Sequence, residues 1–275
     1  MPQVSLRVTH PGRAEVDAAA PDAASLGAAL DAVFADDVTT VAWWVPVGDW
    51  AARRTAWRLG FSYGGVLRGW SDGADAWAFT LRHDDPREPR TPWLDNPVIE
   101  GAGVRLRPFT DADVPRVVEG IGDPATQHWL AFMPRDPGPA EGRAYLETAL
   151  ERLATNHTIT WAFAATGDDL LLGAVGLYRL EAEPEVGYWT HPDARGRGLT
   201  TRAAALAVEH AFGKLGLDRL AAYAAAENTP SLRVLEALGM RRTGVHRRAA
   251  HAADGTPVDL VGYELLAEEA TASRR

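Results

Sequence analysis

The sequence predicts an α/β protein: a mixed β-sheet flanked by helices, preceded by a smaller, partial copy of the same pattern. Three observations lead to this prediction. Strand-like and helix-like segments alternate along the second part of the chain. A proline-rich stretch separates that part from the first, and the two parts share a repeated sequence pattern. The 275 residues are enough for about two domains.

The proline-rich stretch marks the domain boundary. Residues 84–97 read DDPREPRTPWLDNP and contain four prolines. Proline fixes φ and lacks an N–H donor, so the stretch is excluded from a central strand or a helix interior. It is typical of a semi-rigid, extended linker. We therefore expect a first domain over residues 1–83, a linker over 84–97 and a second domain over 98–268.

The second domain alternates in the order β-α-α-β-β-β-α-β-α-β-β. Helices are predicted where apolar residues recur every three or four positions, and strands where short apolar stretches end at turn residues. The expected strands cover residues 104–108, 160–166, 170–178, 185–190, 217–225, 240–250 and 257–266. The expected helices begin near Thr110 and cover 139–154, 199–215 and 230–238. Hairpin turns are expected at Gly167-Asp168 and Asp254-Gly255.

The first domain resembles the last half of the second. Residues 54–69 and 233–248 align at a constant offset of 179 and share six of sixteen residues. The same offset aligns apolar positions of the strands before them. A repeat of this size indicates a copied part of a domain rather than a solenoid. Because a half-fold has open sheet edges, we expect it to pack against the second domain or a second chain, which leaves a homodimer open.

Composition argues against several classes of function. The chain has no cysteine, which excludes disulfides, thiolate metal sites and cysteine nucleophiles. Its net charge of −9 speaks against a nucleic-acid partner. No apolar stretch reaches the ~18 residues that a membrane span needs, and the first ten residues do not resemble a secretion signal. We expect a cytoplasmic protein with no metal and no membrane partner.

The segment most informative about function is residues 185–204, which read EVGYWTHPDARGRGLTTRAA. An expected strand ends near His191, and a helix is expected from Leu199. The loop between them contains Arg195, Gly196, Arg197 and Gly198. The first turn of a helix offers unpaired N–H groups and a positive dipole end, so the segment predicts a phosphate-binding loop. Gly-x-Gly alone is a weak signal, because the segment matches neither a Walker P-loop nor the dinucleotide fingerprint.

This segment resembles the acyl-CoA-binding motif of the GNAT superfamily of N-acetyltransferases, Gln/Arg-x-x-Gly-x-Gly/Ala. Arg195, Gly198 and Thr200 occupy its three defined positions, and Thr200 departs from the usual small residue. The strand EVGYW at 185–189 and the segment NTPSLRVLEALGM at 228–240 resemble the RimJ/RimL type, which acetylates the N-termini of ribosomal proteins. The resemblance covers about residues 104–266.

The resemblance implies a GNAT-type mixed sheet and direct transfer of an acetyl group from acetyl-CoA to a primary amine, on a peptide N-terminus or a small molecule, without a metal. Strands 185–190 and 217–225 would splay apart around the pantetheine arm. Trp189, Thr190 and His191 would line the arm through their main chain. The pyrophosphate would lie on the loop Arg195, Gly196, Arg197 and Gly198, and on Leu199, Thr200 and Thr201, with added charge from Arg202. Asn228 would bond the arm from the other strand.

Glu185 and Ser231 are the catalytic candidates. An ammonium group must lose a proton before attack. Glu185 is the expected base, because strand alternation places it on one face with Gly187, which would leave room for a substrate. The alternative is a solvent-facing carboxylate at a strand end. Ser231 matches a family serine that protonates the leaving thiolate, and its alternative is a backbone-bonding residue at a helix start. Thr243 stands where many relatives carry glutamate.

Other functions stay open. Thr200, Thr243 and the degenerate first domain would also suit a non-catalytic acyl-CoA sensor or a partner-binding protein. An antibiotic- or metabolite-modifying enzyme would share the chemistry and differ in its acceptor. The first domain has no Gly-x-Gly before its helix at about 22–34, and Asp49 and Ala52 stand at the positions that match Asn228 and Ser231. We therefore expect no acyl-CoA site in the first domain.

Overall fold

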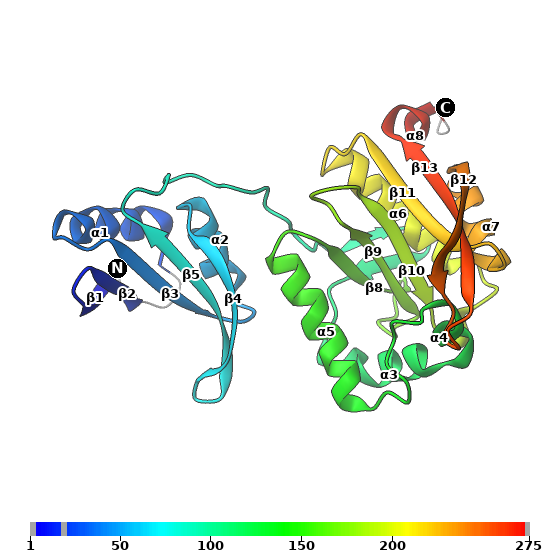
Figure 1. Cartoon of the computed structure of the whole chain (residues 1–275), viewed down its shortest axis with the longest axis horizontal. Coiled ribbons are helices and arrows are strands. Elements are labelled where there is room, and N and C mark those ends of the chain that lie inside the picture. Colours follow the sequence, from blue (N-terminus) through cyan, green and yellow to red (C-terminus); the bar gives the residue numbers. More distant parts are fainter. Residues whose placement is uncertain (1–3, 18–20, 273–275) are drawn as a thin grey trace. The chain divides into compact units, whose positions relative to one another are not determined.

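The chain forms two compact units, Met1–Trp93 and Leu94–Arg275. The structure is a computed structural model that describes residues 4–17 and 21–272. Each unit contains its own β-sheet and its own buried core (Figure 1).

The proline-rich segment 84–97 makes side-chain hydrogen bonds within each unit. Within the first unit, Trp57 Nε1 donates to Thr91 O at 2.6 Å. Within the second, Asn96 Nδ2 donates to Thr160 O at 3.0 Å. The division between the units falls between Trp93 and Leu94, inside the segment expected to be a linker.

The first unit is a five-stranded sheet in the order β1-β2-β3-β5-β4, with two helices. Only β2 and β3 run parallel among its described strands. Trp43 and Trp77 are fully buried in its core. The elements are β1 (Ser5–His10), β2 (Arg13–Asp17), α1 (Ala23–Ala35), β3 (Thr40–Pro46), α2 (Trp50–Arg58), β4 (Ser62–Ser71) and β5 (Ala74–Arg82).

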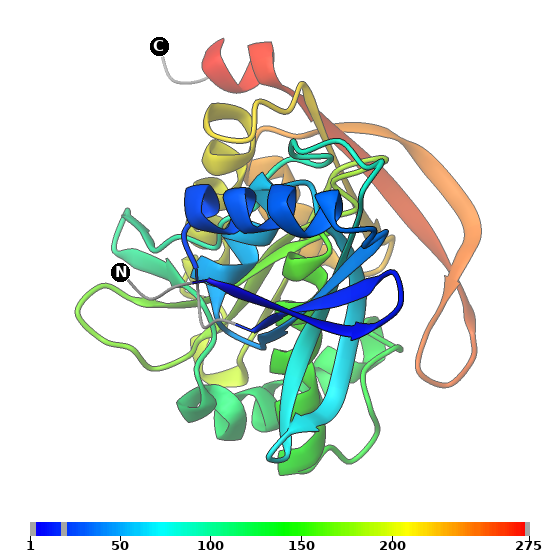
Figure 2. The same cartoon turned by 90° about the vertical axis from the view of Figure 1, so that its left-hand side faces the viewer.

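The second unit is an eight-stranded sheet in the order β12-β13-β11-β10-β9-β8-β7-β6. Its strands are β6 (Ile99–Gly101), β7 (Val104–Arg107), β8 (Ile159–Ala165), β9 (Gly173–Tyr178), β10 (Glu185–Thr190), β11 (Arg219–Ala225), β12 (Arg241–His251) and β13 (Pro257–Leu266). Its helices are η1 (Asp111–Asp113), α3 (Val114–Gly122), α4 (Pro124–Trp129), α5 (Pro139–Ala154), η2 (Pro192–Ala194), α6 (Leu199–Gly213), α7 (Thr229–Ala237) and α8 (Ala267–Ala272). Helices α3 and α5 cover one face and α6 and α7 the other (Figure 1). Figure 2 shows β12 and β13 as a long twisted hairpin.

The first unit has the topology of the second half of the larger sheet. The order β1-β2-β3-β5-β4 corresponds to β9-β10-β11-β13-β12, with one parallel pair at the same place in each. Strand β3 and helix α2 begin and end 179 residues before β11 and α7. Asp49 caps α2 by accepting from Ala52 N, as Asn228 caps α7 by accepting from Ser231 N. The sequence similarity thus extends to the backbone.

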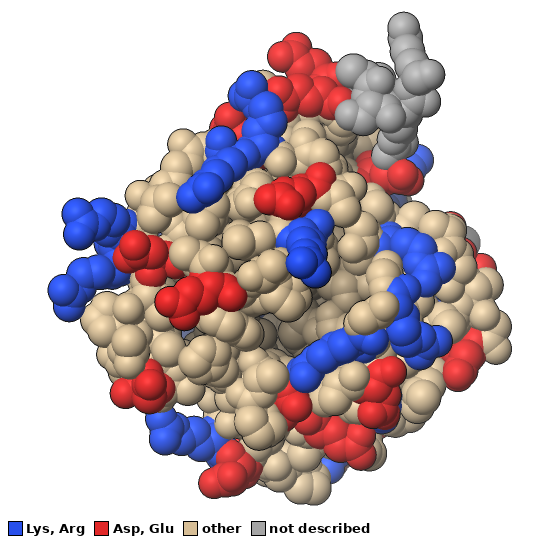
Figure 3. All heavy atoms as spheres, turned by 90° about the vertical axis from the view of Figure 1, so that its right-hand side faces the viewer, with Lys and Arg blue, Asp and Glu red and all other residues tan. Residues whose placement is uncertain are grey.

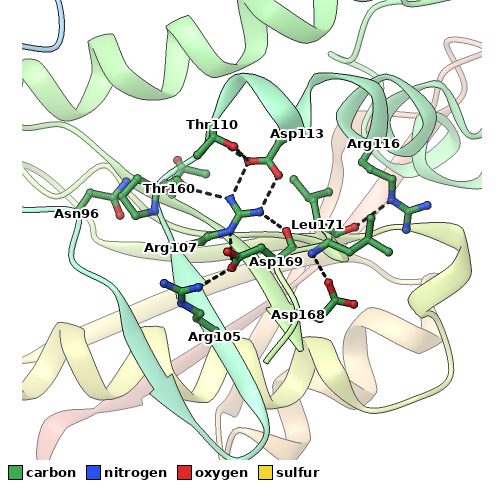
Figure 4. Close-up of polar contacts among 12 residues, drawn as sticks. Asn96, Arg105, Arg107, Thr110, Asp113, Arg116, Thr160, Asp168, Asp169 and Leu171 are labelled. Carbon is green, nitrogen blue, oxygen red and sulfur yellow. Dashed lines mark hydrogen bonds and ion pairs between the residues drawn. The ribbon is translucent and has the colours of Figure 1, made fainter. Parts of the chain in front are cut away.

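A buried ion pair fixes the start of α3 to strand β7. The Arg107 guanidinium donates to both carboxylate oxygens of Asp113, at 2.7 and 2.8 Å (Figure 4). It also donates to Asp169 O, in the connection between β8 and β9, at 2.5 Å. Such a two-bond pair fixes orientation as well as distance. The pair therefore sets where α3 crosses the sheet.

Two expectations about this region need correction. The sequence suggested a single helix near Thr110, whereas a second short helix, α4, begins at Pro124 with Asp123 as its N-cap; a proline at the first helical position suits such a start. The turn at Gly167-Asp168 is not a tight hairpin, because β9 begins only at Gly173.

Trp189 joins β10 to the helices on its face. Its side chain is 6% exposed and packs against α3 in a core cluster that also contains Val117, Ile121, Met133 and Leu171. Its Nε1 donates to Tyr145 Oη at 3.0 Å. A Cβ atom at Gly120 would lie 2.2 Å from the Trp189 ring. The helix can approach the strand only because residue 120 has no side chain.

Replacing Gly120 with alanine should lower the free energy of unfolding by about 1–3 kcal/mol, because the added methyl overpacks the Trp189 contact. Gly213→Ala is the matched control: it is also helical, and its Cβ would meet no atom within 4 Å. It should be neutral or slightly stabilising. Urea unfolding followed by tryptophan fluorescence measures both. Equal stability of the two variants would contradict the packing described here.

Candidate active site

Strands β10 and β11 pair at one position only. Glu185 stands beside Ala221, and Ala221 N donates to Pro184 O at 2.8 Å. On its other edge, β10 pairs with β9 along its whole length, from Glu185 to Thr190. Beyond Glu185, the edge of β10 that faces β11 therefore lacks a neighbouring strand. Because backbone polar groups require partners, this splayed gap is suited to a ligand that hydrogen-bonds along it.

The direction of the main chain decides which residues of β10 face the gap. His191 N donates to Leu172 O at 2.9 Å, on the β9 side. Main-chain groups of successive strand residues point to opposite edges, so Trp189 also faces β9, while Tyr188 and Thr190 face the gap. This corrects the expectation that Trp189 and His191 would offer their main chain to the arm.

The loop before α6 leaves its N–H groups open. Gly196 and Gly198 have φ angles of 71° and 66°, which glycine adopts without strain. A Cβ at either position would meet no atom within 4 Å. The first amide of this turn to bond within the helix is Arg202 N, which donates to Gly198 O. The first-turn N–H groups without a helical partner belong to Leu199, Thr200 and Thr201.

Two of the three arginines near this loop hold it in place. Arg195 donates to Asp123 and, at 2.9 Å, to Thr126 Oγ1, both at the start of α4. Arg202 donates to Ala102 O at 2.9 Å and to the main-chain oxygen of Arg197 at 3.3 Å. The Arg197 side chain is exposed and has no polar partner in the described part of the chain. Arg197 is thus the arginine of this loop that is available to an anion.

The buried polar residues near the loop have structural partners. Thr200 Oγ1 lies 2.5 Å from Thr190 Oγ1, which ties the end of β10 to the start of α6. His191 is 2% exposed. Its Nδ1 accepts from Asp193 N at 3.3 Å, which leaves Nε2 to donate to Glu119 at 3.1 Å. The side chains of Thr200 and His191 therefore support the loop rather than point into it.

Glu185 lies where the two strands begin to separate. Its Oε1 accepts from Arg179 Nη1 at 2.6 Å. Burial raises the pKa of the Glu185 carboxyl, and the neighbouring Arg179 offsets only part of this effect. The expected room beside Gly187 is absent, because a Cβ there would lie 3.1 Å from the Tyr178 ring.

Ser231 lies in the first turn of α7, opposite β10. Its N–H donates to Asn228 Oδ1 at 3.2 Å, so Asn228 serves first as a helix cap and keeps its Nδ2 for another partner. The Ser231 hydroxyl lies 3.1 Å from Tyr188 Oη. Tyr188 was not singled out from the sequence. The available signal was strand alternation, which places its side chain opposite those of Glu185 and Trp189.

Burial raises the pKa of Tyr188 to about 12, against a smaller opposing effect of its bond to Ser231. The phenol therefore stays protonated at neutral pH. Together, Tyr188 and Ser231 place two hydroxyl groups beside the splayed strands, on the face of the sheet that α6 and α7 cover. These are groups that can donate a proton or a hydrogen bond to a leaving group.

The surface at the β12 and α7 end is hollowed near its middle, and basic side chains border the hollow (Figure 3). Among the described residues, no cluster of histidine and acidic side chains could hold a metal ion. No described helix combines the length and apolar character that a membrane span requires.

Comparison with known proteins identifies the class. The family profile described as "Acetyltransferase (GNAT) domain" matches residues 104–241. The chain belongs to this family. The match confirms the predicted mixed α/β fold and the prediction of an acyl-CoA-dependent N-acetyltransferase. Enzymes of this family use acetyl-CoA and act on amines.

The individual relatives share a minority of their residues with this chain. YjcK of Bacillus subtilis, described as a probable N-acetyltransferase, is 27% identical over 158 residues, which cover 55% of this chain and 87% of YjcK. The "putative ribosomal N-acetyltransferase" YdaF of the same species is 34% identical over 105 residues, 37% of this chain and 57% of YdaF. Mycobacterium smegmatis RimJ in complex with CoA-disulfide has a TM-score of 0.53 at 22% identity, over 62% of this chain and 90% of RimJ. The RimJ comparison shows a common fold.

The ion pair between Arg195 and Asp123 should make stability depend on pH. Burial acts to raise the pKa of Asp123, but bonds from Arg195 and from Thr126 N outweigh it, so the pKa lies below its usual value. The stabilisation is therefore present at neutral pH and is lost as the pH falls through that lowered pKa. Asp123→Asn keeps the cap and removes the charge. It should cost about 1 kcal/mol at pH 7, since Arg195 is partly solvent-screened.

The measurement is the difference in unfolding free energy between wild type and Asp123→Asn from pH 7 downwards. The difference should shrink towards zero below about pH 4. Asp111→Asn, at an exposed carboxylate of the same unit, should show little difference throughout. A difference for Asp123→Asn that stays constant with pH would show that charge is not the cause.

Proposed function

We propose that this protein acetylates the primary amine of a protein N-terminus, with acetyl-CoA as donor and direct attack in a ternary complex. One observation carries the proposal: the open N–H groups at the start of α6 follow directly on a strand that separates from its parallel neighbour. The description of YdaF as a "putative ribosomal N-acetyltransferase", together with the sequence resemblance to the RimJ/RimL type, favours a protein acceptor over a small-molecule amine.

The residues present fit the donor. The N–H groups of Gly196, Gly198, Leu199, Thr200 and Thr201 would hold the pyrophosphate, with charge from Arg197. This arrangement uses the positive end of the α6 dipole. The main chain of Tyr188 and Thr190 would bond the pantetheine arm, and Asn228 Nδ2 would bond it from the other side. Six residues of β10 span about 17 Å, which separates the phosphate-binding loop from Glu185.

The side chains at the splayed end would then perform the transfer. Glu185 takes a proton from the ammonium group of the acceptor, through the carboxylate oxygen that Arg179 leaves free. The amine nitrogen attacks the thioester carbonyl, and a main-chain N–H of β10 stabilises the developing oxyanion. The C–N bond forms and the C–S bond breaks. Ser231 donates its hydroxyl proton to the departing sulfur, and the second proton of the attacking nitrogen passes to water as the amide forms.

We also propose that the first unit is a copy of the second half of this fold without a donor site. Asp22 caps α1: its carboxylate accepts from Ser25 N at 2.9 Å and from Ser25 Oγ at 2.7 Å. At the corresponding place before α6 stands Gly198, whose surroundings are open. A carboxylate at a helix start satisfies the N–H groups there and repels a phosphate. One donor site per chain is the consequence.

Replacing Gly198 with valine should weaken acetyl-CoA binding at least about tenfold, because the side chain would cover the open N–H groups and strain the backbone. Gly216→Val is the matched control. Gly216 has nearly the same φ, 67°, and open surroundings, but it follows the far end of α6. Calorimetric titration should find one site per chain, and affinity retained in the control. Equal loss in both variants, or two sites in wild type, would contradict the proposal.

Replacing Glu185 with glutamine should lower kcat/KM by about 10²-fold, the lower end of general-base contributions. In wild type, activity should fall as the pH drops through the raised pKa of this carboxyl, because protonation removes the base. The variant should lack that acidic limb. Free thiol release is followed with peptides and small amines as acceptors. Glu183→Gln, which changes a neighbour bonded to Arg219, should keep its activity.

The same assay separates the alternatives. Turnover with small amines but not with peptides would favour a metabolite- or antibiotic-modifying enzyme. Binding of acetyl-CoA, seen as a raised melting temperature, without turnover on any acceptor would favour a sensor. Either outcome would overturn the N-terminal acetyltransferase proposed here.

A further inference from the structure

Tyr188 contacts Ser231 at two atoms. The Tyr188 hydroxyl lies 3.1 Å from Ser231 O and 3.1 Å from Ser231 Oγ. The side chain leaves β10 on the face covered by α6 and α7, and it crosses to the first turn of α7. No other side chain of the described residues has a hydrogen bond to the Ser231 hydroxyl. The serine hydroxyl is thus oriented by one tyrosine.

The two contacts allow two arrangements of hydrogen atoms. A carbonyl oxygen can only accept, so in the first arrangement Tyr188 donates to Ser231 O and can accept the serine hydrogen. In the second arrangement, Tyr188 donates to Ser231 Oγ and the serine hydrogen is free to point elsewhere. A single phenolic hydrogen therefore controls whether the serine proton is held back or presented.

We propose that Tyr188 is a positioning residue for acetyl transfer and acts through Ser231. This rests on the function proposed above, in which Ser231 donates to the leaving sulfur. As the C–S bond breaks, its electron pair goes to sulfur, which takes the serine proton. Ser231 Oγ in turn takes the phenolic proton, and water returns a proton to Tyr188. Linked donors of this kind strengthen one another.

Tyr263 provides a matched control. It is a buried tyrosine whose hydroxyl also reaches α7, where it donates to Glu236 Oε1 at 3.2 Å. Glu236 lies in the last turn of the helix, away from Ser231. Tyr263→Phe removes the same atom from the same kind of site. The variant therefore measures the general effect on kcat of losing a hydrogen bond between a buried tyrosine and α7.

The experiment compares steady-state kinetics of wild type, Tyr188→Phe, Ser231→Ala, the double variant and Tyr263→Phe. Tyr188→Phe should lower kcat about tenfold with little change in the KM for acetyl-CoA. The double variant should be no slower than Ser231→Ala, because the tyrosine acts through the serine. Tyr263→Phe should keep the wild-type kcat. Melting temperatures and coenzyme A affinities of the two phenylalanine variants should match.

A Ser231→Cys background adds a readout that a purely structural role would not change. A thiol is a stronger acid than a hydroxyl, so it depends less on a second donor. Adding Tyr188→Phe to Ser231→Cys should therefore lower kcat by less than about twofold. The same tenfold loss in both backgrounds would overturn the inference.

The outcomes also distinguish this inference from the proposed function. A wild-type protein with no acetyl transfer on any acceptor would refute the function. An active wild type that is slowed by Ser231→Ala but not by Tyr188→Phe would refute only the role of Tyr188. Independent, multiplying losses in the double variant would refute it as well.

Discussion

The candidate site depends on one interruption in a β-ladder: the pairing of β10 with β11 ends after Glu185. Elsewhere in the second unit the strands pair along several residues. Unpaired main-chain groups inside a protein are costly, so an unfinished ladder is stable only where water or a ligand completes it. The separation also opens the space in which Ser231 and Tyr188 meet. Binding of the donor and chemistry on it would both follow from this one gap.

Charge near the loop before α6 is largely balanced within the protein. Arg195 is paired with Asp123, and Arg202 bonds main-chain oxygens. With a net charge of −9, the chain provides no general attraction for a polyanion. In the proposed site, the first-turn N–H groups of α6 and Arg197, which has no polar partner among the described residues, would supply the attraction locally. Main-chain dipoles that are already fixed need no reorganisation when an anion binds. This suits a loop that Arg195 and Arg202 hold in place.

Much of the fold could be predicted from the sequence, because strong periodicity and turn residues coincide. The bounds of α5, β10 and β13 agree with the expected ones. Elements set by tertiary contacts were missed: β6 has three residues, too few for a periodic signal, and α4 depends on the Asp123 cap. The Gly-x-Gly loop was recognisable because glycine conformation is local.

The finer features of the site could not be predicted, because they depend on neighbours remote in sequence. Which main-chain groups of β10 face the gap is set by the register with β9. The Tyr178 ring occupies the space beside Gly187 from an adjacent strand. The role of Tyr188 appears only once α7 is placed beside β10. Residue types in the sequence predicted a phosphate-binding loop and a base. The direction of the main-chain groups and the side-chain contacts could be seen only in the folded structure.

The cap on α1 has a consequence for how folds can be reused. The strand order of the first unit recurs in the second half of the larger sheet, yet at the start of α1 the Asp22 carboxylate accepts from the N–H of Ser25. A helix capped in this way has a negative partner for the positive end of its dipole without any bound anion. In the proposed assignment, the Asp22 carboxylate at the start of α1 takes the place that a donor phosphate would take at the start of α6.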